Sequence, residues 1–456
     1  MEETNKFLVT VEEPILVYPE TFNSEHTLYL SPLDLQAPLF MYTLYFYKKD
    51  NIKSSTDIVF DALKEALQKV LVLYYPAAGR LRHNLETGKP EIECNNQGAL
   101  LVRATTDARI EELGDPMNTD PELEKFVYKL RPTSGNPVIV TQVTACACGG
   151  IVIGFGSRHE LFDAFSALQF LSAWGAVTRG TPLSEIPIPS HNRELLKPKQ
   201  SELSLSQQSL LVMKKFDGIP LLTRADEKKS WEGTVTDFAS LGIRPQYVMK
   251  VFRLTKEMLD YLKQKAMESG EIEKCSTFDV VTAHAWQARV QSLEMDPFEK
   301  VMLRFPVDGR TKIDPPLPPC FIGNVFIMAS HACTVSDIRD SSLSSIVKRV
   351  QQAKADVKNS YIRNMINALA ATQIKALPSF RETTIVTDWT RFPHHLLDFG
   401  WGGTIFATQV AMPLLDVIFL TSSSSKDEDL YVRLGLLPNY MEKFEQHFLQ
   451  IQPETN

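Results

Sequence analysis

The chain has 456 residues, of which 44% are hydrophobic and 23% are charged. This length and composition predict a globular protein with a large core and more than one domain. The net charge of −7 provides no overall basic surface, so nucleic acid is not expected as the main partner.

The first half of the chain alternates between strand and helix patterns. Apolar, β-branched runs predict strands at residues 7–17, 41–47, 99–104, 138–147 and 151–155. Apolar residues at helical spacing predict one helix at 55–72 and another from Ala164, with Gly175 and Gly180 as candidate ends. This mixed order predicts a layered α/β domain at residues 1–180.

Residues 181–245 have a different character, with clustered prolines followed by serine- and lysine-rich stretches. Segments of this length inside compact proteins are usually linkers or functional lids. We interpret this segment as the crossover to a second α/β domain at residues 246–456. Strands are predicted there at 247–254, 301–307, 324–329, 384–389 and 431–436, and helices at 255–267, 278–289, 342–369 and from near Pro438.

The cysteines and the termini exclude further classes of protein. Six cysteines scattered over a long chain do not predict a disulfide framework. Cys146 and Cys148 lie on an apolar run without accompanying histidines, so we expect buried thiols and no metal site. The acidic N-terminus lacks a signal-type core, and no apolar run has membrane-spanning length. These features predict a soluble, cytoplasmic protein without a membrane span.

His159 is the first candidate for catalysis. It follows the predicted buried strand at 151–155 and precedes a helix that Asp163 can cap. A histidine held at such a junction can transfer protons near neutral pH. His394 and Asp398 match the same His-x-x-x-Asp spacing, so the motif is weak by itself, and a structural histidine is the alternative.

Several further motifs, taken together and in order, resemble the BAHD family of plant acyl-CoA-dependent acyltransferases. They are LSPLD at 30–34, YPAAGRL at 75–81, HELFDA at 159–164, PVDGR at 306–310, GN at 323–324 and DFGWG at 398–402. The resemblance covers nearly the whole chain. It implies two similar-sized mixed-sheet domains with a channel between them, the first carrying HxxxD and the second carrying DFGWG. It also implies acyl-CoA as co-substrate and no bound cofactor.

The chemistry of acyl transfer assigns a role to His159. A hydroxyl that attacks a thioester must lose its proton, and one base that later returns the proton is sufficient. No nucleophile elbow of the G-x-S-x-G type is present, so a serine-hydrolase mechanism loses its best support. The resemblance places Thr387 and Trp389 as donors to the oxyanion, and their side chains are of the right donor type. The alternative is that both residues only pack.

The resemblance gives other motif residues structural roles. It pairs Asp163 with Arg310 in a buried ion pair that holds the turn carrying His159. Asp398, Gly400, Trp401 and Gly402 are expected to form a rigid turn without chemistry. The family usually has glycine after the motif aspartate, and Ala164 would be strained there if that position required a positive φ.

Coenzyme A requires cations near its phosphates. Lys250 and Arg253 begin a locally basic stretch, although a solvated face is an alternative interpretation. Ser276 and Thr277 lie where the resemblance places contacts with coenzyme A.

The stretch QFLSAWGAVTRG resembles the branch of the family that acylates hydrophobic alcohols. We therefore expect a monomeric O-acyltransferase that moves an acetyl or aromatic acyl group onto a terpenoid or benzyl-type alcohol. N-acylation of an amine and a catalytically silent binding protein for a hydrophobic metabolite are the alternatives.

Overall fold

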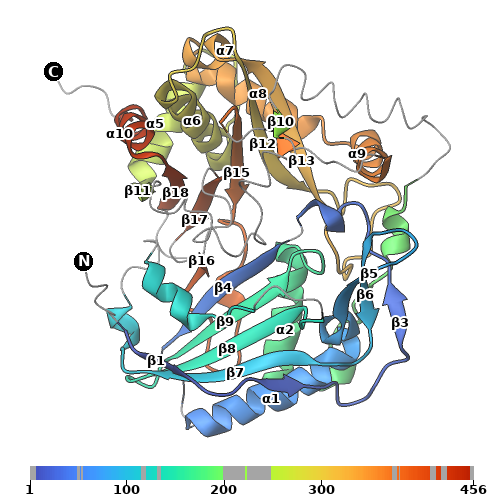
Figure 1. Ribbon diagram of the computed structural model, residues 1–456. Helices are drawn as coiled ribbons and strands as arrows, with labels where there is room; N and C mark the ends of the chain where they lie inside the picture. Colours follow the sequence, from blue (N-terminus) through green and yellow to red (C-terminus); the bar gives the residue numbers. More distant parts are fainter. Residues whose placement is uncertain are drawn as a thin grey trace. The chain divides into compact units, whose positions relative to one another are not determined.

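The computed structural model describes most of the chain (Figure 1). The described residues are 7–37, 39–48, 52, 55–113, 120–130, 135–198, 221–222, 248–371, 377–378, 381–410, 417–422 and 429–451. The chain forms two compact units, each built from three segments. The first unit comprises Met1–Lys197, Pro318–Val325 and Phe392–Met412, and the second comprises Pro198–Leu317, Phe326–Arg391 and Pro413–Asn456.

A seven-stranded sheet in the order β1-β7-β8-β9-β4-β16 organises the first unit, with β2 also paired to β7. Its strands are β1 (Val9–Val11), β2 (Ile15–Val17), β4 (Phe40–Tyr47), β7 (Ala99–Thr106), β8 (Ile139–Cys146), β9 (Ile151–Arg158) and β16 (Phe406–Val410). The β7–β8 pair is parallel, and the other described pairs in this sheet are antiparallel. The first unit also contains a three-stranded sheet in the order β3 (His26–Leu28), β6 (Pro90–Cys94) and β5 (Arg80–His83).

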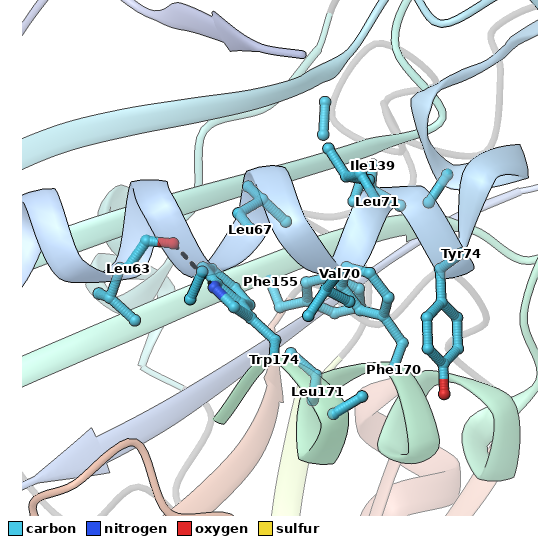
Figure 2. Packing of buried hydrophobic residues seen from close by; sticks show 14 of the residues in the cluster. Leu63, Leu67, Val70, Leu71, Tyr74, Ile139, Phe155, Phe170, Leu171 and Trp174 are labelled. Atoms are coloured by element: carbon cyan, nitrogen blue, oxygen red, sulfur yellow. Dashed lines mark hydrogen bonds between the residues drawn. The ribbon is translucent and has the colours of Figure 1, made fainter. Parts of the chain in front are cut away.

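Two helices, α1 (Thr56–Leu73) and α2 (Ala164–Thr178), pack together and cover one face of this sheet. Figure 2 shows the core between them, where the Trp174 indole N–H donates to the Leu63 carbonyl at 2.9 Å. Successive side chains of β4 point to opposite faces of the sheet. Tyr45 and Tyr47 belong to this core, and Leu44 belongs to the core on the opposite face. The predicted mixed α/β arrangement is therefore confirmed for this unit.

Short 3-10 helices complete the first unit and carry several residues of the site described below. They are η1 (Asp34–Gln36), η3 (Tyr75–Ala78), η4 (Ile110–Glu112), η5 (Pro121–Phe126), η6 (Leu183–Glu185), η7 (Arg193–Leu196) and η9 (His394–Leu396).

The second unit contains a six-stranded mixed sheet in the order β11-β18-β17-β15-β12-β13. Its strands are β11 (Val248–Leu254), β12 (Lys300–Asp308), β13 (Phe326–Thr334), β15 (Thr383–Asp388), β17 (Val417–Ser422) and β18 (Leu430–Leu436). A separate pair joins β10 (Leu221–Leu222) to β14 (Leu377–Pro378). The helices are α5 (Lys256–Met267), α6 (Thr277–Ser292), α7 (Ser336–Arg339), α8 (Leu343–Ala355), α9 (Asn359–Ala371) and α10 (Pro438–Phe448).

In the second half of the chain, three helices begin where the sequence predicted them. Thr255 and Ser276 are the N-caps of α5 and α6, and Pro438 opens α10. The helix expected at 342–369 is divided into α8 and α9. The strand expected at 324–329 begins at Phe326, which leaves Asn324 in the first unit.

The domain boundaries differ from the simple division at residues 180 and 246. The DFGWG segment lies in the first unit, because β16 pairs with β4 along Phe406–Val410. Residues up to Lys197 also group with the first unit. Most of the predicted crossover, at 199–220 and 223–247, lies outside the described residues.

The remaining sequence-based expectations concern cysteines, metals and membranes. All six cysteines are free thiols, and Cys146 and Cys148 are buried as predicted. Within the described ranges, no group of three or more His, Cys, Asp and Glu side chains is suited to a metal ion. None of the helices in those ranges is long and apolar enough to cross a membrane.

Candidate active site

His159 lies immediately beyond the end of β9. This strand is buried between β8 and β4, because its β-branched and apolar residues fill both faces of the sheet. The backbone N–H of His159 donates to the Leu39 carbonyl at 2.8 Å. The hydrogen bonding between β9 and β4 therefore extends one residue beyond the strand, to the histidine. The sheet thus fixes the backbone that carries the candidate base.

Asp163 closes the turn that follows His159. It is the N-cap of α2, and its Oδ1 accepts the Ser166 backbone N–H at 2.9 Å, as the cap prediction requires. Its Oδ2 accepts the backbone N–H of Val325 at 3.1 Å. Ala164 occupies the first helical position and is not among the residues with positive φ, so the alanine introduces no strain.

Asn324 holds the imidazole of His159. Its side-chain Oδ1 lies 2.9 Å from His159 Nδ1. Its Nδ2 donates to the His159 carbonyl at 2.6 Å and to Asp34 Oδ1 at 3.1 Å. Asn324 is fully buried, so these bonds form away from competing water.

This network assigns the tautomer of His159. Both hydrogens of the Asn324 amide are used by the two acceptors, which fixes the orientation of the amide. The amide oxygen therefore faces Nδ1, and Nδ1 must carry the proton and donate it to that oxygen. Nε2 of the neutral ring then keeps the lone pair that a general base requires.

Asp34 anchors the amide from the other side. Its Oδ1 also accepts the Asn324 backbone N–H at 2.8 Å. Its Oδ2 accepts from the backbone and hydroxyl of Ser31 at 2.8 and 2.7 Å, and from Arg193 Nε at 3.1 Å. Asp34 and Arg193 form an ion pair whose side chains are both fully buried.

The sequence did not predict that Asn324, Asp34 and Arg193 would hold His159. The LSPLD and GN elements were visible signals for Asp34 and Asn324, but no pattern connected them to His159. Arg193 lay in the expected crossover and carried no signal. Asp163, at the fourth residue after His159, was correctly placed as a helix cap.

The proposed oxyanion donors lie in the second unit. Thr387 is near the end of β15, where it is in register with Phe419 of β17. The Trp389 backbone N–H continues this edge by donating to the Leu420 carbonyl at 2.8 Å. Thr387 and Trp389 are half-buried, with Asp388, the last residue of β15, between them. Their part in the site stays a prediction.

Arg310 also lies in the second unit. Its backbone N–H and its Nη1 both donate to Asp308 Oδ1 at 3.1 Å, which closes the PVDGR turn. Its expected ion pair with Asp163 stays a prediction.

The expected contacts with coenzyme A occupy the second unit, and three of the four side chains have polar partners. Lys250 pairs with Glu445 at 2.5 Å and Arg253 with Asp429 at 2.5 Å. The Ser276 hydroxyl accepts the Asp279 backbone N–H in the cap of α6, and Thr277 is the first residue of that helix. Coenzyme A would compete with these partners, so the four assignments stay predictions.

The DFGWG segment forms a tight turn packed on α2. Asp398 Oδ1 accepts the backbone N–H groups of Gly400 and Trp401 at 2.7 and 3.0 Å. Gly400 and Gly402 have φ values of 101° and 81°, which favour glycine. The rings of Phe399 and Trp174 meet edge to face with centroids 5.2 Å apart.

His394, the competing motif histidine, is half-buried in the first unit, and both its ring nitrogens are shielded from solvent. Its ring lies 5.9 Å from that of Tyr45 and 5.9 Å from that of Phe392. Burial lowers the pKa of His394 to about 4. A base this weak is poorly matched to proton abstraction near neutral pH.

Comparisons with known proteins bear on the whole chain. The family model described as "Transferase family" matches residues 7–451. Omega-hydroxypalmitate O-feruloyl transferase of Arabidopsis thaliana is 32% identical over 447 residues, covering 96% of this chain and 92% of that protein. Fatty alcohol:caffeoyl-CoA acyltransferase of the same plant is 31% identical, with 98% and 99% covered. Anthranilate N-benzoyltransferase protein 3 of Dianthus caryophyllus is 29% identical, with 96% and 99% covered.

Solved structures share the fold. Vinorine synthase superposes with a TM-score of 0.73 at 19% identity, covering 97% of this chain and 98% of that chain. The F. sporotrichioides TRI101 structure, complexed with coenzyme A and T-2, gives a TM-score of 0.69 at 14% identity, with 92% and 97% covered.

Proposed function

Because the chain belongs to the BAHD acyltransferases of the Transferase family, we propose that it acylates a hydroxyl group of a hydrophobic specialised metabolite. The protein is an acyl-CoA-dependent acyltransferase, and acyl-CoA is its co-substrate. The donor we propose is an acetyl-CoA or aromatic acyl-CoA, and the acceptor is a terpenoid or benzyl-type alcohol.

The hydrogen bond between His159 Nδ1 and Asn324 Oδ1 carries this proposal. In a neutral imidazole it supports the tautomer with the proton on Nδ1, which leaves on Nε2 the lone pair that takes a proton from an alcohol. Asp163 is occupied by two backbone N–H groups at the start of α2, which supports a structural role. Asn324 therefore takes the orienting part that a carboxylate has in a serine-hydrolase triad.

The proposed reaction is a direct transfer in a ternary complex. The acceptor oxygen attacks the thioester carbon while its proton passes to His159 Nε2, giving a tetrahedral intermediate with one C–O⁻ bond. Collapse of this intermediate breaks the C–S bond, and the imidazolium returns the proton to the departing sulfur. The products are an ester and free coenzyme A, and no acyl-enzyme is formed.

Charge on the intermediate requires donors, and we assign them to the Thr387 hydroxyl and the Trp389 indole N–H. Both side chains are half-buried, Thr387 within β15 and Trp389 directly after its end, which supports a role toward a ligand. An oxyanion donor of this kind typically contributes about 3–4 kcal/mol.

An exposed aromatic side chain near the start of α2 supports an apolar acceptor. Phe165, at the start of α2, keeps 42% of its surface exposed and meets Phe392 edge to face at 4.9 Å. The names of two relatives combine aromatic acyl groups with omega-hydroxypalmitate or a fatty alcohol. These observations favour a hydroxyl on an apolar skeleton. N-acylation is the second candidate, because one relative is an anthranilate N-benzoyltransferase.

A substrate screen tests the proposal. Purified protein is incubated with acetyl-CoA, benzoyl-CoA and hydroxycinnamoyl-CoA against matched apolar alcohols and amines, with thiol release and product mass as readouts. We expect esters to form and His159→Ala to abolish their formation. His394→Ala, at the second motif match, is the control and should retain most activity.

Amides formed faster than esters would favour the second candidate. The proposed function fails if no donor and acceptor pair gives a product, or if His159→Ala transfers acyl groups as fast as the unmodified protein. The expected monomeric state and cytoplasmic location stay predictions.

A further inference from the structure

Arg193 is a fully buried cation in the first unit with two defined contacts. It opens η7, in a segment where the sequence predicted only a crossover. Its Nε donates to Asp34 Oδ2 at 3.1 Å, and its Nη2 donates to the Leu161 carbonyl at 3.0 Å. The residue is 1% exposed, so both bonds are shielded from solvent.

These contacts join both parts of the structure that positions the base. Leu161 belongs to the turn between His159 and Asp163, so one bond holds the backbone carrying the imidazole. Asp34 binds Asn324 through Oδ1, so the other bond holds the partner of Nδ1. Gly323, which precedes Asn324, has a φ of 151°, which favours glycine, and a Cβ there would lie 3.0 Å from the Phe321 ring.

The charge of Arg193 has a specific consequence for the histidine. A carboxylate as buried as Asp34 needs an opposite charge and several donors to compensate for its lost hydration, and Arg193 provides that charge. If Asp34 turned away, Asn324 Nδ2 would lose an acceptor. The amide would then be able to rotate and present its NH₂ group to His159. Nδ1 would have to accept that bond, and the proton would move to Nε2, which would remove the base.

We propose that Arg193 is a positioning residue for acyl transfer: through Asp34 and Asn324 it keeps the His159 proton on Nδ1, and through Leu161 it fixes the turn. This inference rests on the proposed role of His159 as the base. Arg193 touches no reacting atom, so its effect is expected in kcat and in the tautomer, with little change in the KM for acyl-CoA.

Three variants separate positioning from stability. Arg193→Met and Asp34→Asn each remove one member of the buried pair, and Asp34→Asn/Arg193→Met removes both charges. Each single variant leaves a buried group uncompensated and should lower the melting temperature, whereas the double variant should recover part of the loss. We expect kcat to remain lowered by roughly 10- to 100-fold in the double variant, the range seen when an orienting partner is lost. A kcat that recovers together with the melting temperature would overturn the proposal.

A matched control lies beside the histidine. Glu160 is also a buried carboxylate on the same turn, 1% exposed, and pairs with Arg158 at 2.6 Å. Its described contacts involve Arg158, not the imidazole. Glu160→Gln breaks a buried pair and should lower the melting temperature, but it should leave kcat within about twofold of the unmodified protein. A loss in Glu160→Gln as large as that in the double variant would show a general sensitivity of the turn and would contradict a special role for Arg193.

A readout independent of activity is the ¹⁵N spectrum of histidine-labelled protein, assigned with His159→Gln. We expect His159 to carry its proton on Nδ1 in the unmodified protein and to show a mixture of tautomers in Arg193→Lys. This milder variant keeps the charge but cannot span Asp34 and Leu161 with a single nitrogen. An unchanged tautomer in Arg193→Lys and in the double variant would refute the inference. Because this spectrum requires no turnover, it distinguishes that failure from failure of the proposed function.

Discussion

At the scale of single side chains, the two histidines with the same motif differ in their surroundings. His159 Nδ1 contacts the amide oxygen of Asn324, and the same amide donates a hydrogen bond to Asp34. His394 is half-buried between aromatic rings, and the loss of hydration at its ring lowers its pKa to about 4. Spacing alone cannot distinguish a polar environment from an apolar one, because the partners come from distant parts of the chain.

Thr387 provides a test at the residue scale. If its hydroxyl donates to the oxyanion, the bond is strongest in the transition state, and its loss lowers kcat with little change in KM. Thr387→Val keeps the side-chain shape and should lower kcat at least about tenfold, below the full oxyanion contribution because Trp389 shares the charge. Steady-state kinetics and a thermal melt on the same preparation provide the comparison. An unchanged kcat with an altered melting temperature would assign Thr387 to strand packing.

At the scale of elements, α2 begins directly after the turn that carries His159, the proposed base. The N-cap Asp163 ends the turn, and the Ser166 hydroxyl binds both the N–H and the carbonyl of Gly323 at 3.0 Å. The first turn of α2 therefore holds the segment that delivers Asn324. A local capping rule and a long-range contact meet in the same helical turn.

Asp163→Asn tests this junction. The amide replaces one acceptor by a donor, so a bond to Ser166 or Val325 is lost, and we expect a destabilisation of roughly 1–3 kcal/mol. The expected pairing with Arg310 is tested in the same series by Arg310→Ala and the double variant, using chemical denaturation. A pair in contact should make the double variant less damaging than the sum of the singles. Strict additivity would remove the pairing and leave Asp163 as a cap alone.

The contact between the end of α1 and the segment before η7 gives the stability a pH dependence. His191 Nε2 lies 3.0 Å from the Leu73 carbonyl, and burial lowers the pKa of His191 from 6.5 to about 4. The unfolded chain therefore binds a proton between these values that the folded chain does not. The stability contributed by neutral His191 is complete above about pH 6.5 and is lost as the pH falls toward 4.

His191→Gln removes this titration. Between pH 7 and pH 5 the unmodified protein should lose on the order of 2 kcal/mol through His191, and the variant should be spared that loss. Melting temperatures at both pH values measure the difference, and comparing the two slopes cancels any direct cost of the substitution. His394 titrates in both proteins and does not affect the comparison. Parallel slopes would show that His191 is protonated as readily in the folded protein as in the unfolded chain.

At the scale of the whole chain, each unit is assembled from three separate segments. The last segment of the first unit, Phe392–Met412, returns to pair β16 with β4 and packs the DFGWG turn on α2. Gly175 of α2 permits this approach, because a Cβ there would lie 2.4 Å from the Asp398 carbonyl oxygen.

Gly175→Ala tests whether that close approach matters for the assembled unit. In an open helix the change would stabilise by about 1 kcal/mol through helix propensity. Here the methyl group meets backbone, so we expect the melting temperature to fall and the unfolding transition to lose cooperativity. Differential scanning calorimetry measures both quantities. A higher melting temperature would mean that α2 and the turn separate without cost.

The elements and their chemistry follow largely from local sequence. A continuous run of apolar, β-branched residues predicted β9, and the spacing from Ala164 predicted α2. Thr255 and Ser276 were identified as caps, because each signal acts within a few residues. The ordered motifs also indicated the acyltransferase family, which the family match confirms.

The partners of the base arise from long-range contacts. His159 and Asn324 are 165 residues apart, and Arg193 and Asp34 are 159 apart, so no periodicity or spacing connects them. The return of β16 to the first sheet has the same origin, because strand pairing satisfies backbone groups with whichever edge the fold brings near. The local sequence therefore determined which histidine begins the helix junction, and folding determined which amide, carboxylate and guanidinium surround it.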